Sequence, residues 1–98
     1  MDLTIKQLLD KAIQMHEQGK HGEAELIYKN ILKDNPKHGH TNHNLGVLMS
    51  SLNQVEKTKA ALPLLKIATE ADSSNAQFWM SYSNALYATN FLKDAVTN

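Results

Sequence analysis

The chain has 98 residues, which suffices for one small domain and excludes a second. Ten Lys balance ten Asp and Glu and there is no Arg, so the composition favours neither a nucleic acid nor an anionic membrane as a partner. The absence of Cys excludes disulfides and thiolate chemistry, and no apolar run is long enough for a signal peptide or a membrane span, so we expect a cytoplasmic protein.

Apolar residues recur at intervals of three and four along most of the chain, a spacing typical of amphipathic helices, and we predict an all-α fold. The first helix begins at Leu3 and stops where Gly19 and Gly22 interrupt the pattern. The second spans residues 23–34 and ends at Asn35-Pro36, because a residue that precedes proline avoids the helical conformation.

The predicted third helix spans residues 40–52, with Asn53 as the break after it. Pro63 lies inside the next apolar pattern and lacks the backbone N–H that a helix interior needs, whereas the first turn of a helix tolerates proline. We therefore expect the fourth helix to begin near residues 58–60 and to run to Asp72.

Either Ser74 or Asn75 is the predicted N-cap of a fifth helix, whose aromatic residues, Trp79 among them, we assign to the core. This helix is expected to end at Thr89-Asn90. A sixth helix then begins within residues 91–97.

Small residues recur at equivalent places of three helix pairs. In the first helices they are Ala12, Gly46 and Ser83, and in the second helices Ala24, Ala61 and Ala95. Ala12 and Gly46 lie 34 residues apart, whereas Gly46 and Ser83 lie 37 apart because the turn at residues 53–57 is three residues longer. Small residues let two helix backbones approach closely, and larger neighbours fill the core beside them.

This register, together with Asn44-Leu45-Gly46, residues 22–28 and Asn35-Pro36, resembles the tetratricopeptide repeat (TPR) family over nearly the whole chain. The chain departs from the family pattern at Asn42, Lys11 and Ser73, where large, Leu and Pro residues are usual. The resemblance implies an α-solenoid of antiparallel helix pairs wound into a right-handed superhelix. It would form a single domain, residues 1–98, with repeats at about 3–36 and 39–73 and an incomplete third repeat at about 76–98.

The resemblance further implies an inner groove, lined by the first helix of each pair, that holds a peptide or a segment of a partner protein. The residues expected to face it, called here the predicted groove residues, are Lys6, Leu9, Asp10, Ile13, Glu17, His40, His43, Asn44, Val47, Gln77, Met80, Ser81, Asn84 and Tyr87.

Known members of the family use this groove in two relevant ways. Some clamp the C-terminal carboxylate of a chaperone with Lys, Asn and Arg side chains, but only Asn44 matches that set here and the cations are missing. Asn44 also resembles the asparagine with which repeats of O-linked sugar transferases grip an extended backbone. In those transferases, asparagines at the same inner position form a ladder of amides along the groove. Asn84 would extend such a ladder here, whereas Asp10 and Ser81 stand at the equivalent sites and interrupt it. Two interpretations of Asn44 therefore stay open: it binds a peptide backbone, or it is a solvated polar residue near a helix start.

His38, His40 and His43 are spaced closely enough to suggest a zinc or nickel site. No Cys accompanies them and no Asp or Glu lies between Asn35 and Gln54, so we predict no metal site and no cofactor. The spacings assemble neither a glycine-rich phosphate loop nor a nucleophile with its base and orienting group. We therefore predict that the chain on its own is not an enzyme.

The incomplete third pair lacks the polar covering helix with which family members usually end. The residues expected to be left bare, and so to mediate self-association as a homodimer, are Phe91, Leu92, Ala95 and Val96, together with the outer face of the helix from Trp79 to Tyr87. The expected function is a non-catalytic protein-interaction module. Alternatively, the chain is the N-terminal regulatory or substrate-recognition segment of a longer transferase, because runs similar to residues 22–38 precede bacterial glycosyltransferases and sulfotransferases.

Overall fold

The computed structural model describes residues 4–52 and 54–97, with side chains described as far as Asn90. Over these ranges the chain forms five helices and no strand, which confirms the prediction of an all-α fold. The helices are α1 (Ile5–Glu17), α2 (His21–Asp34), α3 (Gly39–Ser50), α4 (Val55–Ala71) and α5 (Ala76–Thr97).

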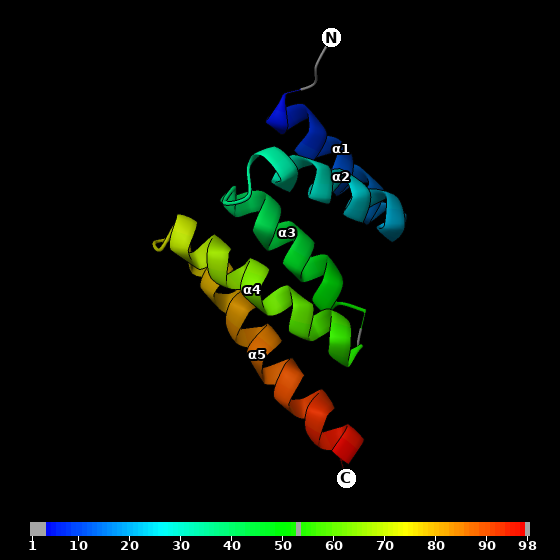
Figure 1. Ribbon diagram of the computed structural model, residues 1–98, viewed down its shortest axis with the longest axis vertical. Helices are drawn as coiled ribbons and strands as arrows, with labels where there is room; N and C mark the ends of the chain where they lie inside the picture. The colour runs from blue at the N-terminus through cyan, green and yellow to red at the C-terminus, as the bar shows by residue number, and fades with distance from the viewer. Residues whose placement is uncertain (1–3, 53, 98) are drawn as a thin grey trace.

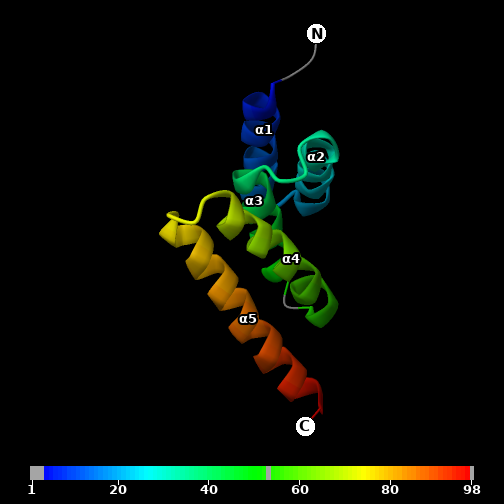
Figure 2. The same ribbon diagram turned by 60° about the vertical axis from the view of Figure 1, so that its left-hand side comes forward.

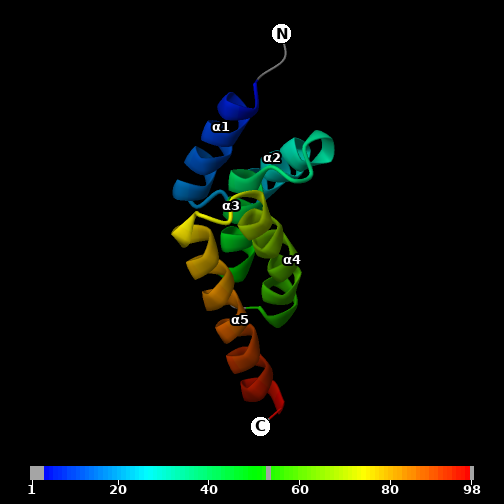
Figure 3. The ribbon, with the colours of Figure 1, turned by 90° about the vertical axis from the view of Figure 1, so that its left-hand side faces the viewer.

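Each helix packs against the next one along the chain, and the molecule is elongated, at 53 × 30 × 20 Å (Figure 1). The end of α5 projects beyond α4, far from α1 (Figure 2). In a side view, α1 and α5 lie on the left with α3 beside them, while α2 and α4 lie on the right (Figure 3). This packing is consistent with a helical repeat. Over the described residues, no helix combines the length and the apolar character needed to cross a bilayer.

Local hydrogen bonds fix both ends of α1. The Thr4 hydroxyl accepts from the backbone N–H of Gln7, and the Gln7 side chain accepts from the Thr4 N–H, which forms a capping box. At the other end Gly19 adopts a positive φ of 78°, and the following Lys20 N–H donates to the Met15 carbonyl at 2.9 Å. Gly19 therefore ends α1 as predicted. Gly22 does not extend the break, because α2 already begins at His21.

The prediction for the start of α4 was wrong. The Thr58 N–H donates to the Gln54 carbonyl at 2.9 Å, so the first turn forms three residues earlier than expected, at Val55. Pro63 consequently lies in the helix interior and is exposed. Burial of Leu65 on the opposite side holds the helix against its neighbours, which offsets the missing hydrogen bond. The break assigned to Asn53 lies outside the described residues.

The prediction of a turn at Thr89-Asn90 was also wrong, and with it that of a separate sixth helix. Asn75 caps α5 by accepting from the N–H groups of Gln77 and Phe78, and the helix then runs without a break to Thr97. The Thr89 hydroxyl donates to the Ala85 carbonyl at 2.7 Å, so this polar residue is satisfied within the helix. The side chains of Phe91, Leu92, Ala95 and Val96 lie outside the described part.

The predicted close approach of small residues is confirmed in the first two helix pairs. Ala12 and Ala24 are fully buried between α1 and α2, and Gly46 meets α4 beside Ala61. A Cβ atom at Gly46 would lie 2.6 Å from Leu65 Cδ2, so any larger residue at this crossing would require Leu65 to shift.

The corresponding expectation for the third pair was wrong, because within residues 4–52 and 54–97 no second helix folds back onto α5. Ser83 is exposed, and Trp79, assigned to the core from its sequence, is 46% exposed.

Candidate functional site

The predicted groove residues all lie on α1, α3 and α5, the helices that share one side in Figure 3. Their exposure differs. Exposed members are Lys6, Asp10, Glu17, His40, Gln77, Met80, Asn84 and Tyr87; half-buried members are Leu9, Ile13, Asn44, Val47 and Ser81; His43 is buried. Leu9 and Val47 pack against the core, so they support this surface from beneath.

His43 joins α3 to α5 through hydrogen bonds from both ring nitrogens. Its Nε2 lies 2.7 Å from the Ser81 hydroxyl, and its Nδ1 lies 3.2 Å from Oδ1 of Asn44. An amide oxygen only accepts, so Nδ1 carries the proton and Ser81 donates to Nε2. Burial lowers the pKa of His43 below its ordinary value, and the neighbouring His40 lowers it further, against the hydrogen bond to Asn44. The ring is therefore neutral at neutral pH.

Phe78 of α5 also contacts His43, and the sequence analysis did not identify it. The contacts of His43 with Ser81 and Phe78 are called here the joint between α3 and α5. The buried Phe78 ring stacks on His43 with centroids 4.7 Å apart and meets His40 edge-on at 5.2 Å. Phe78, Ala85 and Thr89 recur at helical spacing, and they mark the stripe of α5 that is buried. The sequence analysis instead assigned to the core the stripe that begins one residue later, at Trp79.

The hydrogen-bonded chain from Ser81 through His43 to Asn44 has the order of a hydroxyl nucleophile, a base and an orienting amide. Because Ser81 is distant from the other two along the chain, the spacing of residues in the sequence does not reveal this arrangement. Ser81, however, lies within α5, where the backbone N–H groups that could stabilise an oxyanion are engaged in helical hydrogen bonds. Phe78 covers the imidazole, and neither hollow described below adjoins it. The geometry fits a structural joint between two helices.

Two of the three histidines considered for a metal site have ring nitrogens engaged in hydrogen bonds to other residues. The Nδ1 atom of His38 accepts from the Thr41 backbone N–H as the cap of α3, while His43 is engaged with Ser81. The rings of His38 and His40 lie 6.5 Å apart. Within residues 4–52 and 54–90, no group of three or more His, Asp or Glu side chains is arranged to hold a metal ion.

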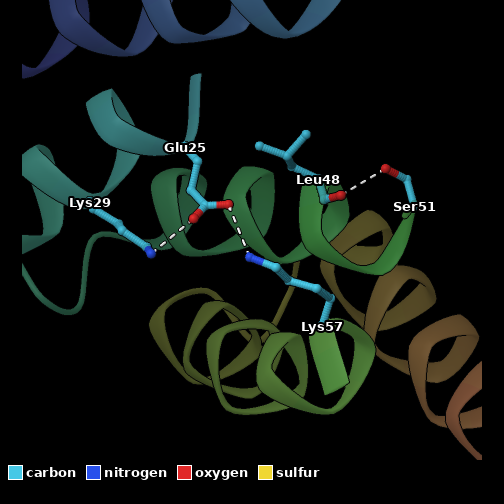
Figure 4. Close-up of polar contacts among 5 residues, drawn as sticks. All are labelled: Glu25, Lys29, Leu48, Ser51 and Lys57. Carbon is cyan, nitrogen blue, oxygen red and sulfur yellow. Dashed lines mark hydrogen bonds and ion pairs between the residues drawn. The ribbon is translucent and has the colours of Figure 1, made fainter. Parts of the chain in front are cut away.

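An ion-pair network formed by Glu25, Lys29 and Lys57 joins α2 of the first helix pair to α4 of the second (Figure 4). Glu25 of α2 lies 2.9 Å from Nζ of Lys29 and 3.5 Å from Nζ of Lys57 on α4. The hydrogen bond from Lys29 is the main reason why the Glu25 pKa is lowered, and Lys57 adds to it. In the same view the Ser51 hydroxyl donates to the Leu48 carbonyl at 2.7 Å, which closes the end of α3. Of these contacts, the one between Glu25 and Lys57 joins two helices, α2 and α4.

Two hollows flank the loop between α2 and α3. One, of about 390 Å³, is lined by Asn35, Pro36, Lys37 and His38. The other, of about 550 Å³, is lined by Lys37, Ile67, Glu70 and Ala71. Neither contains a predicted groove residue, so the sequence analysis did not anticipate them.

Comparison with known proteins adds no relative. No protein-family model matches the chain, and no curated protein or solved structure matches it either. The contacts within the chain are therefore the basis for a functional assignment.

Proposed function

We propose that the chain is a non-catalytic protein-interaction module of the tetratricopeptide-repeat kind. It holds an extended peptide segment of a partner protein against the side formed by α1, α3 and α5. The repeat spacing and the close approaches at Ala12 and Gly46 support the repeat assignment.

The observation that carries the binding proposal is the exposure of two large apolar side chains among the predicted groove residues. Met80 is 63% and Tyr87 75% exposed. They lie two helical turns apart on α5, so they share a face, with the exposed Asn84 between them. A flexible thioether, an aromatic ring and an amide together suit the apolar side chains and the polar backbone of an extended peptide.

The contact of His43 with Asn44 supports the same proposal, because it determines which group of the Asn44 amide is free to bind a peptide. The Asn44 amide oxygen accepts from His43, which leaves its NH₂ group to donate to a peptide carbonyl. The hydrogen bond between His43 and Ser81 also holds together α3 and α5, the helices that carry Asn44 and Asn84, which lowers the ordering cost of binding a peptide across them.

We also propose that the chain self-associates through its C-terminal helix, where sequence analysis places Phe91, Leu92, Ala95 and Val96. Light scattering over a wide concentration range tests this proposal, with Leu92→Glu as the variant expected to weaken the dimer.

Selection of random peptides displayed in extended form, against the purified chain, tests the groove. Affinities of the enriched synthetic peptides are then measured for the wild type and for Tyr87→Ala and Asn84→Ala. Each substitution should weaken binding by about tenfold or more, since tyrosine is a typical hot-spot residue of interfaces and loss of the amide leaves a peptide polar group without its hydrogen bond. Leu26→Ala on α2 is the matched control, because Leu26 is 70% exposed and lies outside the predicted groove.

The proposal fails if no binding peptide is enriched. It fails equally if the enriched peptides bind Tyr87→Ala and Asn84→Ala as tightly as the wild type.

A further inference from the structure

The face of α5 that carries Trp79, Ser83 and Leu86 has no partner within the described residues. Trp79 is 46% and Leu86 41% exposed, and Ser83 between them is exposed. In the repeat register Ser83 corresponds to Gly46 of α3, which is buried where it meets α4. The register thus predicts that a helix covers this face of α5, and none of the five described helices does so.

The exposed surface of this face is apolar and uncharged. The Trp79 Nε1–H donates to the Ser73 carbonyl at 2.8 Å, so the one polar atom of the indole is already satisfied and the rest of the ring is apolar surface. No charged residue lies between Asp72 and Lys93. Charged side chains are what normally keep exposed helices of identical molecules apart, and this stretch of α5 has none.

The arrangement of side chains on this face is self-complementary. Ser83 follows Trp79 by four residues and precedes Leu86 by three, so a small residue separates two large ones in either direction along the helix. Two copies crossing in antiparallel orientation at Ser83 would place each Trp79 beside Leu86 of the other copy. The small Ser83 permits close approach at the crossing, as Gly46 does against α4.

We infer that a second copy of this chain covers the Trp79–Ser83–Leu86 face through an antiparallel, two-fold α5–α5 pair. The inference rests on the proposed self-association and deepens it, because it names the three residues at the contact and the antiparallel orientation, and assigns no part of the contact to Phe91, Leu92, Ala95 and Val96. A single helix pair buries less than a standard interface of about 1,600 Å², so the dimer is weak and dissociates on dilution.

Sedimentation velocity from low to high micromolar concentration tests the interface. The wild type should pass from monomer to dimer, whereas Leu86→Glu should remain monomeric with an unchanged far-UV circular dichroism spectrum. Leu26→Glu, which places the same charge on an exposed leucine of α2, should dimerise like the wild type. A wild type that stays monomeric, or a Leu86→Glu variant that dimerises as the wild type does, would overturn the inference.

Disulfide trapping tests the orientation and does not depend on the stability of Leu86→Glu. Because the chain has no Cys, every cross-link comes from an introduced pair. Ser83→Cys should form a covalent dimer rapidly on mild oxidation, and Asn84→Cys, on the neighbouring face, should do so slowly. Ala76→Cys mixed with Asn90→Cys should give the heterodimer, since these exposed positions lie at equal distances from the crossing. Homodimers of each alone would instead indicate parallel helices and overturn the proposed geometry.

The two proposals fail in different ways. A dimer that Leu92→Glu dissociates and Leu86→Glu does not would retain the proposed self-association and refute this face. Peptide affinity measured on the Leu86→Glu monomer reports on the groove alone, because Leu86 is not a predicted groove residue.

Discussion

α3 and α5 take equivalent places in the predicted repeat register, yet they differ in how much of their surface is buried. Seven of the twelve residues of α3 are buried, including polar ones such as Asn42, because helices pack against it on several sides. The described part of α5 buries a single stripe, formed by Phe78, Ala85 and Thr89. Burial of a given register position therefore depends on the neighbouring helices as well as on the pattern of the helix itself.

The largest expected effect is a difference in the free energy of unfolding between two variants. They place valine at equivalent register positions, Gly46 of α3 and Ser83 of α5. Gly46→Val should lower the free energy of unfolding by about 2–3 kcal/mol, because its Cβ alone would lie 2.6 Å from the fully buried Leu65. Ser83→Val should change it by no more than about 0.5 kcal/mol, since the site is open. Urea unfolding at a concentration where the chain is monomeric measures both. Equal losses would show that α5 is covered as α3 is.

A second prediction concerns the joint between the two helices. His43→Gln should cost about 1–2 kcal/mol at pH 7.5, because the ring loses its stacking on Phe78 and its hydrogen bond to Ser81. Burial lowers the pKa of His43 in the folded chain, so below about pH 6.5 the unfolded chain binds a proton that the folded chain does not. Wild-type stability should therefore be full above that pH and fall as the pH drops through it.

Unfolding free energies measured between about pH 7.5 and pH 5 would show a shallower slope in His43→Gln. The His16 pKa is also lowered, chiefly by burial, so His16→Gln should remove a separate part of the slope and the double variant should be flattest. A slope that is unchanged in His43→Gln would mean that the α3–α5 joint does not exclude the charged imidazole.

The smallest expected effect tests whether α5 is continuous. Asn90 is an exposed residue inside the helix, so Asn90→Ala should raise the free energy of unfolding by about 0.5 kcal/mol and Asn90→Gly should lower it slightly. Circular dichroism should show a matching gain and loss of helix. If the chain turned at this position instead, glycine would be tolerated better than alanine, and the order of the two variants would reverse.

Features governed by nearby residues were predicted well. The ends of α1 and α2 at Gly19 and Asn35-Pro36 follow from backbone restrictions that a single residue imposes. The close approaches at Ala12 and Gly46 follow from side-chain size at a recurring position. These signals lie within a turn or a repeat of the chain, so they can be read from it directly.

The errors occurred where packing outweighed local preference. Pro63 was expected to define the first turn of α4, but burial of the opposite face sustains the helix through it. The Thr89-Asn90 turn was expected from polar residues that α5 instead accommodates within its length. Trp79 was expected in the core, although the helix that would cover it does not fold back within the described residues.

The sequence by itself determined that the chain is helical, where the first two interhelical turns lie and which small residues of the first two helix pairs allow helices to cross, because periodicity, proline and glycine restrictions and residue size act locally. Only the tertiary structure decided which stripe of α5 is buried and that His43 meets Ser81, 38 residues further along the chain. Those outcomes depend on the relative placement of separate helices. Free energies of packing set that placement, and they belong to pairs of distant residues instead of to any one segment.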